Sequence, residues 1–274
     1  MSRFRRTMLV TLSVLWLMLM VTYVVAVSGK PVNIDRIRFP EPSGATYHTG
    51  RRTLFVVGDE GDICEIRTDG EPVKRGDLAK GGRRDLEGVT FDPATGLLYV
   101  AVEGEERILE VDPDKLGILR EFKIPRTWQG KTVLKPGGQG IEAIAFLPDA
   151  KHPHGGTFLV TNQGFKNSPA EDASALLRLE VPLRGKPGAD ARVKIVSYVR
   201  MRVFDLSGLC YDTTAKRLYA ISDSGNRIFE MTPEGKIRKH EALVGQNQEG
   251  IAVDPRGFLY IAQDTGGILK LRLK

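Results

Sequence analysis

Three glutamates stand at the same place in a short phrase that the sequence repeats along its length. Glu87 lies in DLEGVTFD, Glu142 in GIEAIAF and Glu249 in NQEGIAVD, and the same position is Ser207 in DLSGLCYD and Ser43 in the weaker copy PSGATY. Carboxylates gathered around one point repel each other unless protons or a cation intervene. Ca²⁺ accepts six to eight oxygen ligands, so we predict that Glu87, Glu142 and Glu249 bind it. Water filling a channel is the alternative partner for these carboxylates.

A second phrase follows each copy of the first and ends in an acidic or amide residue. These residues are Asp59, Glu103, Asn162, Asp223 and Asp264. Triplets such as DEG, DSG and DTG are typical of turns that an aspartate caps with its own side chain. Turn capping is therefore the simpler explanation. The alternative is that these residues, with Ser43 and Ser207, bind a ligand beside the glutamates.

The elements that must position these residues are short strands in a repeat. A third apolar phrase completes each unit, as ICEI, ILEV, LLRL, IFEM and ILKL. Repetition every ~40 residues of short apolar runs separated by turn residues is typical of a β-propeller. Its innermost strands converge on a central channel, where small residues let backbones approach closely. Glycine follows the repeated Glu or Ser in four copies and Ala143 follows it in the third. We therefore predict that the first phrase forms the innermost strand and that its polar residues ring one mouth of the channel.

Five units predict five four-stranded blades, but the fifth unit ends at Lys274, just after its third strand. An unpaired outer edge is unfavourable, so we expect residues near Val32–Phe39 to supply the missing strand and close the ring. A six-bladed propeller is the alternative. It would require a degenerate unit between Pro182 and Asp205.

The amino terminus differs from the rest of the chain. Met8 to Val27 carries no charged side chain and would be about 30 Å long as a helix, enough to span a hydrocarbon core. Arg3, Arg5 and Arg6 precede it, which places the amino terminus in the cytoplasm. We predict a basic tip and transmembrane anchor over residues 1–28 and a propeller over 29–274, outside the bacterial inner membrane. The alternative is a signal peptide cleaved before Gly29, although the apolar run is long for one.

Charge and motifs exclude several classes of function. The net charge of +6 halves once the three amino-terminal arginines are set aside, and no basic stripe suggests nucleic-acid binding. Cys64 and Cys210 fall in different units, which argues against a disulfide. None of the four histidines occupies a repeated polar position, so a Ser-His-Asp system is not expected. No CxxC, HExxH or phosphate-binding glycine loop is present.

The phrases DLEGVTFDPATGLLYVAVE, DLSGLCYDTTAKRLYAISDSGNRIFEM and NQEGIAVDPRGFLYIAQD resemble the SdiA-regulated family, the YjiK-like membrane-anchored bacterial propellers. The resemblance covers essentially residues 31–274. It implies a β-propeller exposed to the periplasm and implies no activity. ISDSGNRIFEM is also similar to phytase-like esterase propellers, and the layout resembles calcium-dependent lactonases, but no catalytic residue is carried over from either. GIEAIAF departs from the family pattern because it lacks the glycine.

Two functional hypotheses follow. The first is a binding module whose channel mouth holds Ca²⁺ and a small or polymeric ligand. The second is a periplasmic metal-dependent hydrolase acting on esters, lactones or phosphoesters, in which a carboxylate serves as base. The sequence identifies no particular ligand and leaves both open.

Overall fold

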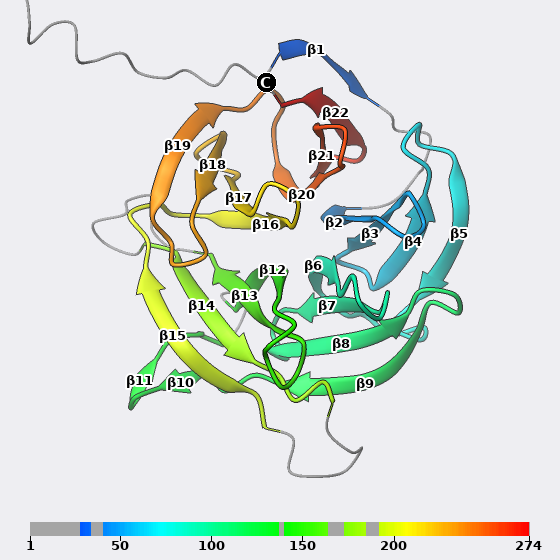
Figure 1. Cartoon of the computed structure of the whole chain (residues 1–274). Helices are drawn as coiled ribbons and strands as arrows, with labels where there is room; N and C mark the ends of the chain where they lie inside the picture. Colours follow the sequence, from blue (N-terminus) through cyan, green and yellow to red (C-terminus); the bar gives the residue numbers. More distant parts are fainter. Residues whose placement is uncertain (1–27, 34–40, 137–139, 164–172, 185–191, 274) are drawn as a thin grey trace, which may run out of the picture.

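The computed structural model describes residues 28–33, 41–136, 140–163, 173–184 and 192–273. Its strands form five sheets of four strands arranged around an axis, each running from the centre outward (Figure 1). Five blades are confirmed, and the six-bladed alternative is wrong, because the sheets form five blades and the described residues between 182 and 205 contribute only the outer strand of the third blade. The predicted anchor, Met8–Val27, lies outside the described residues. Within the described ranges, no helix has the length and apolar character needed to cross a membrane.

The first four blades are consecutive in the chain. The first consists of β2 (Pro42–His48), β3 (Thr53–Gly58), β4 (Asp62–Ile66) and β5 (Pro72–Asp77). The second consists of β6 (Leu86–Phe91), β7 (Leu98–Val102), β8 (Arg107–Asp112) and β9 (Gly117–Lys123). The third consists of β12 (Ile141–Pro148), β13 (Gly156–Asn162), β14 (Ala175–Glu180) and β15 (Lys194–Arg200). The fourth consists of β16 (Leu206–Asp212), β17 (Arg217–Ser222), β18 (Arg227–Met231) and β19 (Ile237–Ala242). A small hairpin, β10 (Thr127–Trp128) and β11 (Lys131–Thr132), lies between the second and third blades in sequence.

The fifth blade takes strands from both ends of the chain. It contains β20 (Gln248–Val253), β21 (Phe258–Gln263) and β22 (Ile268–Arg272), and β1 (Ser28–Asn33) pairs with the free edge of β22 (Figure 1). The predicted closure by an amino-terminal strand is therefore confirmed. The strand lies earlier than expected, and most of Val32–Phe39 falls outside the described residues. Pairing the ends of the chain in one sheet removes an unpaired edge.

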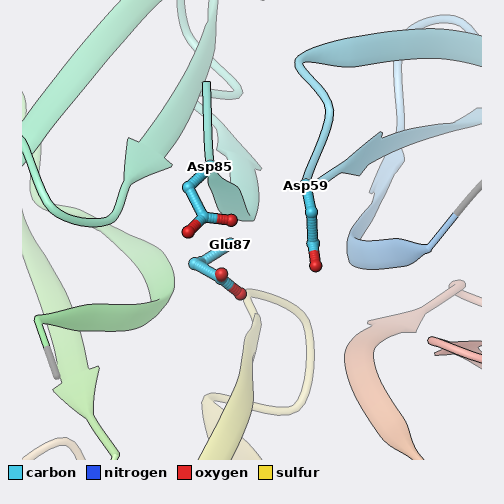
Figure 2. Close-up of side chains that lie close together, drawn as sticks. All are labelled: Asp59, Asp85 and Glu87. Carbon is cyan, nitrogen blue, oxygen red and sulfur yellow. The ribbon is translucent and has the colours of Figure 1, made fainter. Parts of the chain in front are cut away.

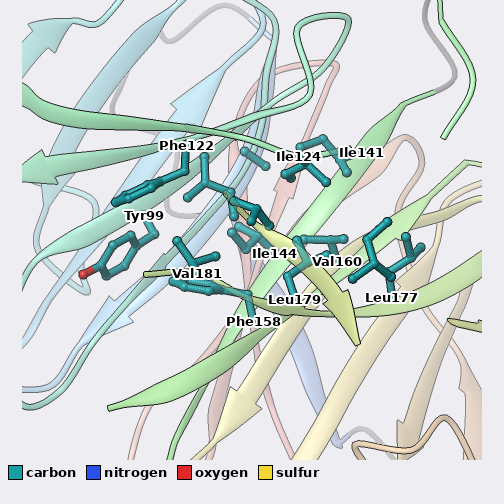
Figure 3. Close-up of a cluster of buried hydrophobic side chains, with 14 of the residues drawn as sticks. Tyr99, Phe122, Ile124, Ile141, Ile144, Phe158, Val160, Leu177, Leu179 and Val181 are labelled. Carbon is teal, nitrogen blue, oxygen red and sulfur yellow. The ribbon is translucent and has the colours of Figure 1, made fainter. Parts of the chain in front are cut away.

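The apolar core is divided among the gaps between blades. Five clusters of buried side chains each join two neighbouring sheets. The cluster between the second and third blades includes Tyr99, Phe146 and Phe158, with the ring centroids of Tyr99 and Phe158 5.0 Å apart (Figure 3). Outer strands alternate exposed and half-buried residues, whereas second strands such as β3 and β7 are buried throughout. Apolar burial between neighbouring sheets fixes the blades against each other. The polar residues of the innermost strands take no part in these clusters.

Candidate functional site

The repeated Glu or Ser lies at a β-bulge near the start of the innermost strand in every blade. In β2, Pro42 pairs with Gly58 and Gly44 pairs with Val57, so Ser43 is the extra residue without a cross-strand partner. The same irregularity brackets the equivalent residues of the other four blades, Glu87, Glu142, Ser207 and Glu249. A bulge redirects a side chain and ends regular pairing. The five residues therefore occupy equivalent places around one mouth of the channel, which we call the acidic mouth.

The glycine after the bulge permits the close contact between neighbouring inner strands. A Cβ added to Gly208 would lie 2.6 Å from the Glu249 carbonyl oxygen, and one added to Gly250 would lie 2.7 Å from the Ala45 amide nitrogen. The third blade has Ala143 at this place and keeps the same bulge. The missing glycine therefore does not displace Glu142 from the ring.

The three glutamates influence each other across the mouth. Burial, followed by the charge of Glu142, raises the pKa of Glu87 well above its ordinary value. Burial and Glu103, with a further contribution from Glu249, raise the pKa of Glu142 in the same way. Burial and the neighbouring aspartates raise the pKa of Glu249 to about 8. The strongest electrostatic influences on all three glutamates come from other carboxylates. The mouth therefore brings together carboxyl groups whose negative charges repel one another.

The tightest acidic cluster at this mouth combines Glu87 with two aspartates. One carboxylate oxygen from each of Asp59, Asp85 and Glu87 can be chosen so that all three lie within 4.8 Å of one another (Figure 2). Asp59 follows β3, while Asp85 and Glu87 lie at the start of β6, so the cluster joins the first two blades. Among the described residues, Glu142 and Glu249 do not form part of such a group.

Asp59 is poorly satisfied by its surroundings. Burial, followed by the charge of Asp85, raises the pKa of Asp59 to about 7. The Ser43 hydroxyl opposes this rise, but it donates its proton to the Leu86 carbonyl oxygen. Oδ1 of Asp59 is buried and accepts no hydrogen bond from the described part of the chain. A buried, unpaired carboxylate oxygen is unfavourable unless a proton or a cation meets it.

The two serines of the ring connect neighbouring blades. Ser43 Oγ donates to the Leu86 carbonyl oxygen, and Ser207 Oγ donates to the Gln248 carbonyl oxygen at 2.7 Å. In both cases the acceptor directly precedes a glutamate of the ring. The serines were predicted to bind ligand, and in the structure their protons hold the next inner strand in place.

Several residues of the second phrase also hold backbone amides. Glu103 Oε1 accepts from the Gly140 amide at 2.8 Å, and Asp223 Oδ1 accepts from the Gln248 amide at 2.8 Å, each across a blade boundary. Asn162 Oδ1 accepts from the Ala175 amide within its own blade at 2.6 Å. Asp264 is partly buried and raises the pKa of Glu249. The bonds of Glu103 and Asp223 therefore join neighbouring blades and do not close a turn, whereas the bond of Asn162 stays within its own blade.

Sequence reasoning missed a third acidic position, two residues before each bulge. Its members are Glu41, Asp85, Gly140, Asp205 and Asn247. Glu41, Asp205 and Asn247 have positive φ angles of 46°, 58° and 54°, a backbone conformation that asparagine and aspartate adopt more readily than most residues. The first letter of DLEG, DLSG and NQEG was the available signal. It was overlooked because an aspartate before a strand looks like an ordinary turn residue.

Glu103 and Glu142 form a pair of hydrogen-bonded carboxyl groups. Burial first, and then the charge of Glu103, raise the pKa of Glu142, and the hydrogen bond raises it further. The same bond and the Gly140 amide lower the pKa of Glu103, but burial outweighs them and the net shift is upward.

The model of the SdiA-regulated family matches residues 18–265, which is most of the chain. The chain belongs to the SdiA-regulated family. The resemblance of the repeated phrases is thereby confirmed.

Solved structures share the fold with this SdiA-regulated chain at low sequence identity. The glutaminyl cyclase of Myxococcus xanthus is 16% identical with a TM-score of 0.58, over 89% of this chain and 93% of that one. The β-propeller domain of Cps50 (Swd1) from Myceliophteria thermophila is 10% identical with a TM-score of 0.50, over 89% and 100%. A gluconolactonase from Xanthomonas campestris is 14% identical with a TM-score of 0.49, over 89% of each chain. At these identities the likeness to the first two structures shows the propeller fold alone.

Proposed function

We propose that this protein is a membrane-anchored periplasmic propeller whose acidic mouth binds a divalent cation, Ca²⁺, and through it an oxygen-rich ligand. The observation that carries the proposal is the cluster of Asp59, Asp85 and Glu87, with carboxylate oxygens within 4.8 Å of one another. Hard cations take carboxylate and water oxygens in variable geometry, which suits three partly exposed carboxylates. Glu142 and Glu249 occupy equivalent bulge positions in their own blades and can ionise when a cation approaches.

The pKa values at the mouth favour cation binding over carboxyl groups that stay protonated at neutral pH. The raised pKa values of Asp59 and Glu249 lie near neutral pH, at about 7 and about 8. These groups can therefore release protons at little cost when a cation arrives. Cation binding to such a site releases protons and weakens as the pH falls.

Calorimetric titration of the detergent-solubilised chain with CaCl₂ and with MgCl₂ tests the cation. We expect Ca²⁺ to bind and to raise the melting temperature, with a stabilisation of about 2.7 kcal/mol at one hundred times the dissociation constant. Asp85→Asn and Glu87→Gln should abolish most of this effect. Glu60→Gln is a matched control, because Glu60 is exposed beside Asp59. Absence of both heat and thermal shift with Ca²⁺ would remove the cation from the proposal.

The anchor is proposed from the sequence. Met8–Val27 carries no charged side chain and follows Arg3, Arg5 and Arg6. Carbonate extraction of membranes and amino-terminal sequencing of the mature protein test it. An anchored protein resists extraction and retains residues 1–28, whereas a cleaved one begins at Gly29 and is soluble.

A metal-dependent hydrolase is the second candidate, and the Glu103–Glu142 pair favours it. Two neighbouring carboxyl groups with raised pKa values can donate and accept a proton within one step. A cation at the Asp59 cluster would polarise an ester, lactone or phosphoester oxygen. A screen of these three substrate classes with and without EDTA separates an enzyme from a binding module. Activity that persists in Glu87→Gln and Glu142→Gln would rule out this assignment.

A further inference from the structure

The strand that follows the proposed anchor enters the propeller on one particular face. β1 runs antiparallel to β22, with Ser28 opposite Arg272 and Asn33 opposite Leu269. Arg272 lies opposite Phe258 at the start of β21, and the Leu273 amide donates to the Gly257 carbonyl oxygen at 2.9 Å. Glu249 and its bulge lie at the other end of this blade, where Gln248 pairs with Gln263. Ser28 is therefore on the face opposite the acidic mouth, which we call the tether face.

The sequence leaves no spacer between the apolar run and this strand. Val27 ends the run and Ser28 begins β1. Six extended residues span about 20 Å at ~3.3 Å per residue, so β1 separates the tether face from the acidic mouth by nearly the height of a blade. A helix that ends at Val27 cannot bring the acidic mouth to the membrane surface without first detaching β1 from β22.

We propose that the propeller stands on the membrane with its tether face against the lipid headgroups and its acidic mouth facing away. This orientation rests on the anchor proposed above. It means that the cation site meets ligands arriving from the periplasmic space and not from the bilayer.

The tether face carries charges of both signs, and Asp114 and Glu234 are exposed in its turns together with basic residues. Arg52 and Lys216 are exposed in turns of this face. Beside β1, Phe258 is surrounded by three cations. Arg256, Lys270 and Arg272 place their charged groups 5.3, 4.8 and 5.5 Å from the ring centroid.

Arg256 also binds the Asp254 carboxylate, and Lys270 donates to the Thr68 carbonyl oxygen. An aromatic ring flanked by basic side chains suits the headgroup depth of an anionic bilayer. The opposite face presents Asp59, Asp85 and Glu87, which anionic headgroups would repel. The carboxylates gathered at the mouth therefore favour the same orientation as the strand pairing.

Two threonine substitutions place a probe on each face. Thr214 lies in an exposed turn of the tether face and Thr265 in an exposed turn beside the acidic mouth. Thr214→Cys and Thr265→Cys in the full chain would be labelled with a fluorescent maleimide. Burial raises the pKa of both native thiols, Cys64 and Cys210, to about 12, so they react slowly. Labelling of the unsubstituted chain measures that background.

The labelled chains would be reconstituted in vesicles of phosphatidylcholine and phosphatidylglycerol that contain a lipid with a spin-labelled headgroup. We expect several-fold stronger quenching at Thr214→Cys than at Thr265→Cys. Adding Arg52→Glu and Lys216→Glu should reduce quenching at position 214, whereas Lys80→Glu, an exposed change on the other face, should not. If the chain floats with the vesicles but quenching at position 214 is equal to or weaker than at position 265, the proposed orientation is wrong and the anchor is retained. Failure of the chain to float with the vesicles would overturn the anchor itself, and the orientation with it.

Discussion

Replacing Glu249 by glutamine should make the cation-free protein more stable at alkaline pH. Glu249 is partly buried, and burial together with Asp223, Asp205 and Asp264 raises its pKa from 4.5 to about 8. Between these two values the native state binds more protons than the unfolded state, so the free energy of unfolding falls as the pH rises. Below pH 4.5 the group is protonated in both states and costs nothing.

The size of the effect follows from the shift. Each pKa unit corresponds to about 1.36 kcal/mol, so full ionisation of Glu249 above pH 8 costs the native state at most about 5 kcal/mol. Neighbouring carboxyls can take up protons in its place, so we expect Glu249→Gln to recover about 2–4 kcal/mol. For a domain of this size that corresponds to a rise in melting temperature of ~5–15 °C.

Thermal melts in EDTA from pH 4 to pH 9 measure this effect. The variant and the parent should melt together at pH 4 and diverge progressively above pH 5, with the variant higher. Glu60→Gln, exposed on the same face, should follow the parent throughout. Identical pH profiles for parent and Glu249→Gln, or a variant less stable at pH 9, would refute the electrostatic account of the mouth. Saturating Ca²⁺ should narrow the gap, because a bound cation stabilises the parent more than the variant.

Three further substitutions test how the mouth and the blades are held. Ser207→Ala removes a 2.7 Å hydrogen bond to the next blade. Urea denaturation should show a loss of about 1 kcal/mol in the free energy of unfolding, with Ca²⁺ affinity retained. A loss of Ca²⁺ affinity in this variant would place the hydroxyl in the cation site. Gly208→Ala puts a Cβ 2.6 Å from the Glu249 carbonyl oxygen. The resulting strain should lower the free energy of unfolding by about 1–3 kcal/mol in the same urea denaturation. An unchanged midpoint would show that β16 and β20 can move apart. Arg120→Ala leaves the buried carboxylate of Glu110 without the arginine that binds it at 3.0 Å. Calorimetric melts should show a loss of about 3–5 kcal/mol, and a loss below about 1 kcal/mol would mean that water replaces the guanidinium.

The sequence by itself indicated the repeat, the innermost strands and the ring of Ser43, Glu87, Glu142, Ser207 and Glu249, and the structure decided between five and six blades. The strands and the ring follow from repetition, because equivalent residues in equivalent strands must occupy equivalent places around an axis. The fifth unit contains only three strands, which leaves an unpaired edge. The sequence therefore also predicted that an amino-terminal strand completes the fifth blade.

Only the tertiary structure decided which polar atoms meet. The repeat does not distinguish a turn cap from a bond across blades, so the contacts of Glu103 with Gly140 and of Asp223 with Gln248 could not be predicted. The repeat also did not place Asp85 in the acidic cluster, because the distance between Asp85 and Asp59 depends on how the first two blades pack. Local patterns are fixed by residues near in sequence, whereas a site built from five separate strands depends on the apolar contacts that set the angle and spacing between the blades.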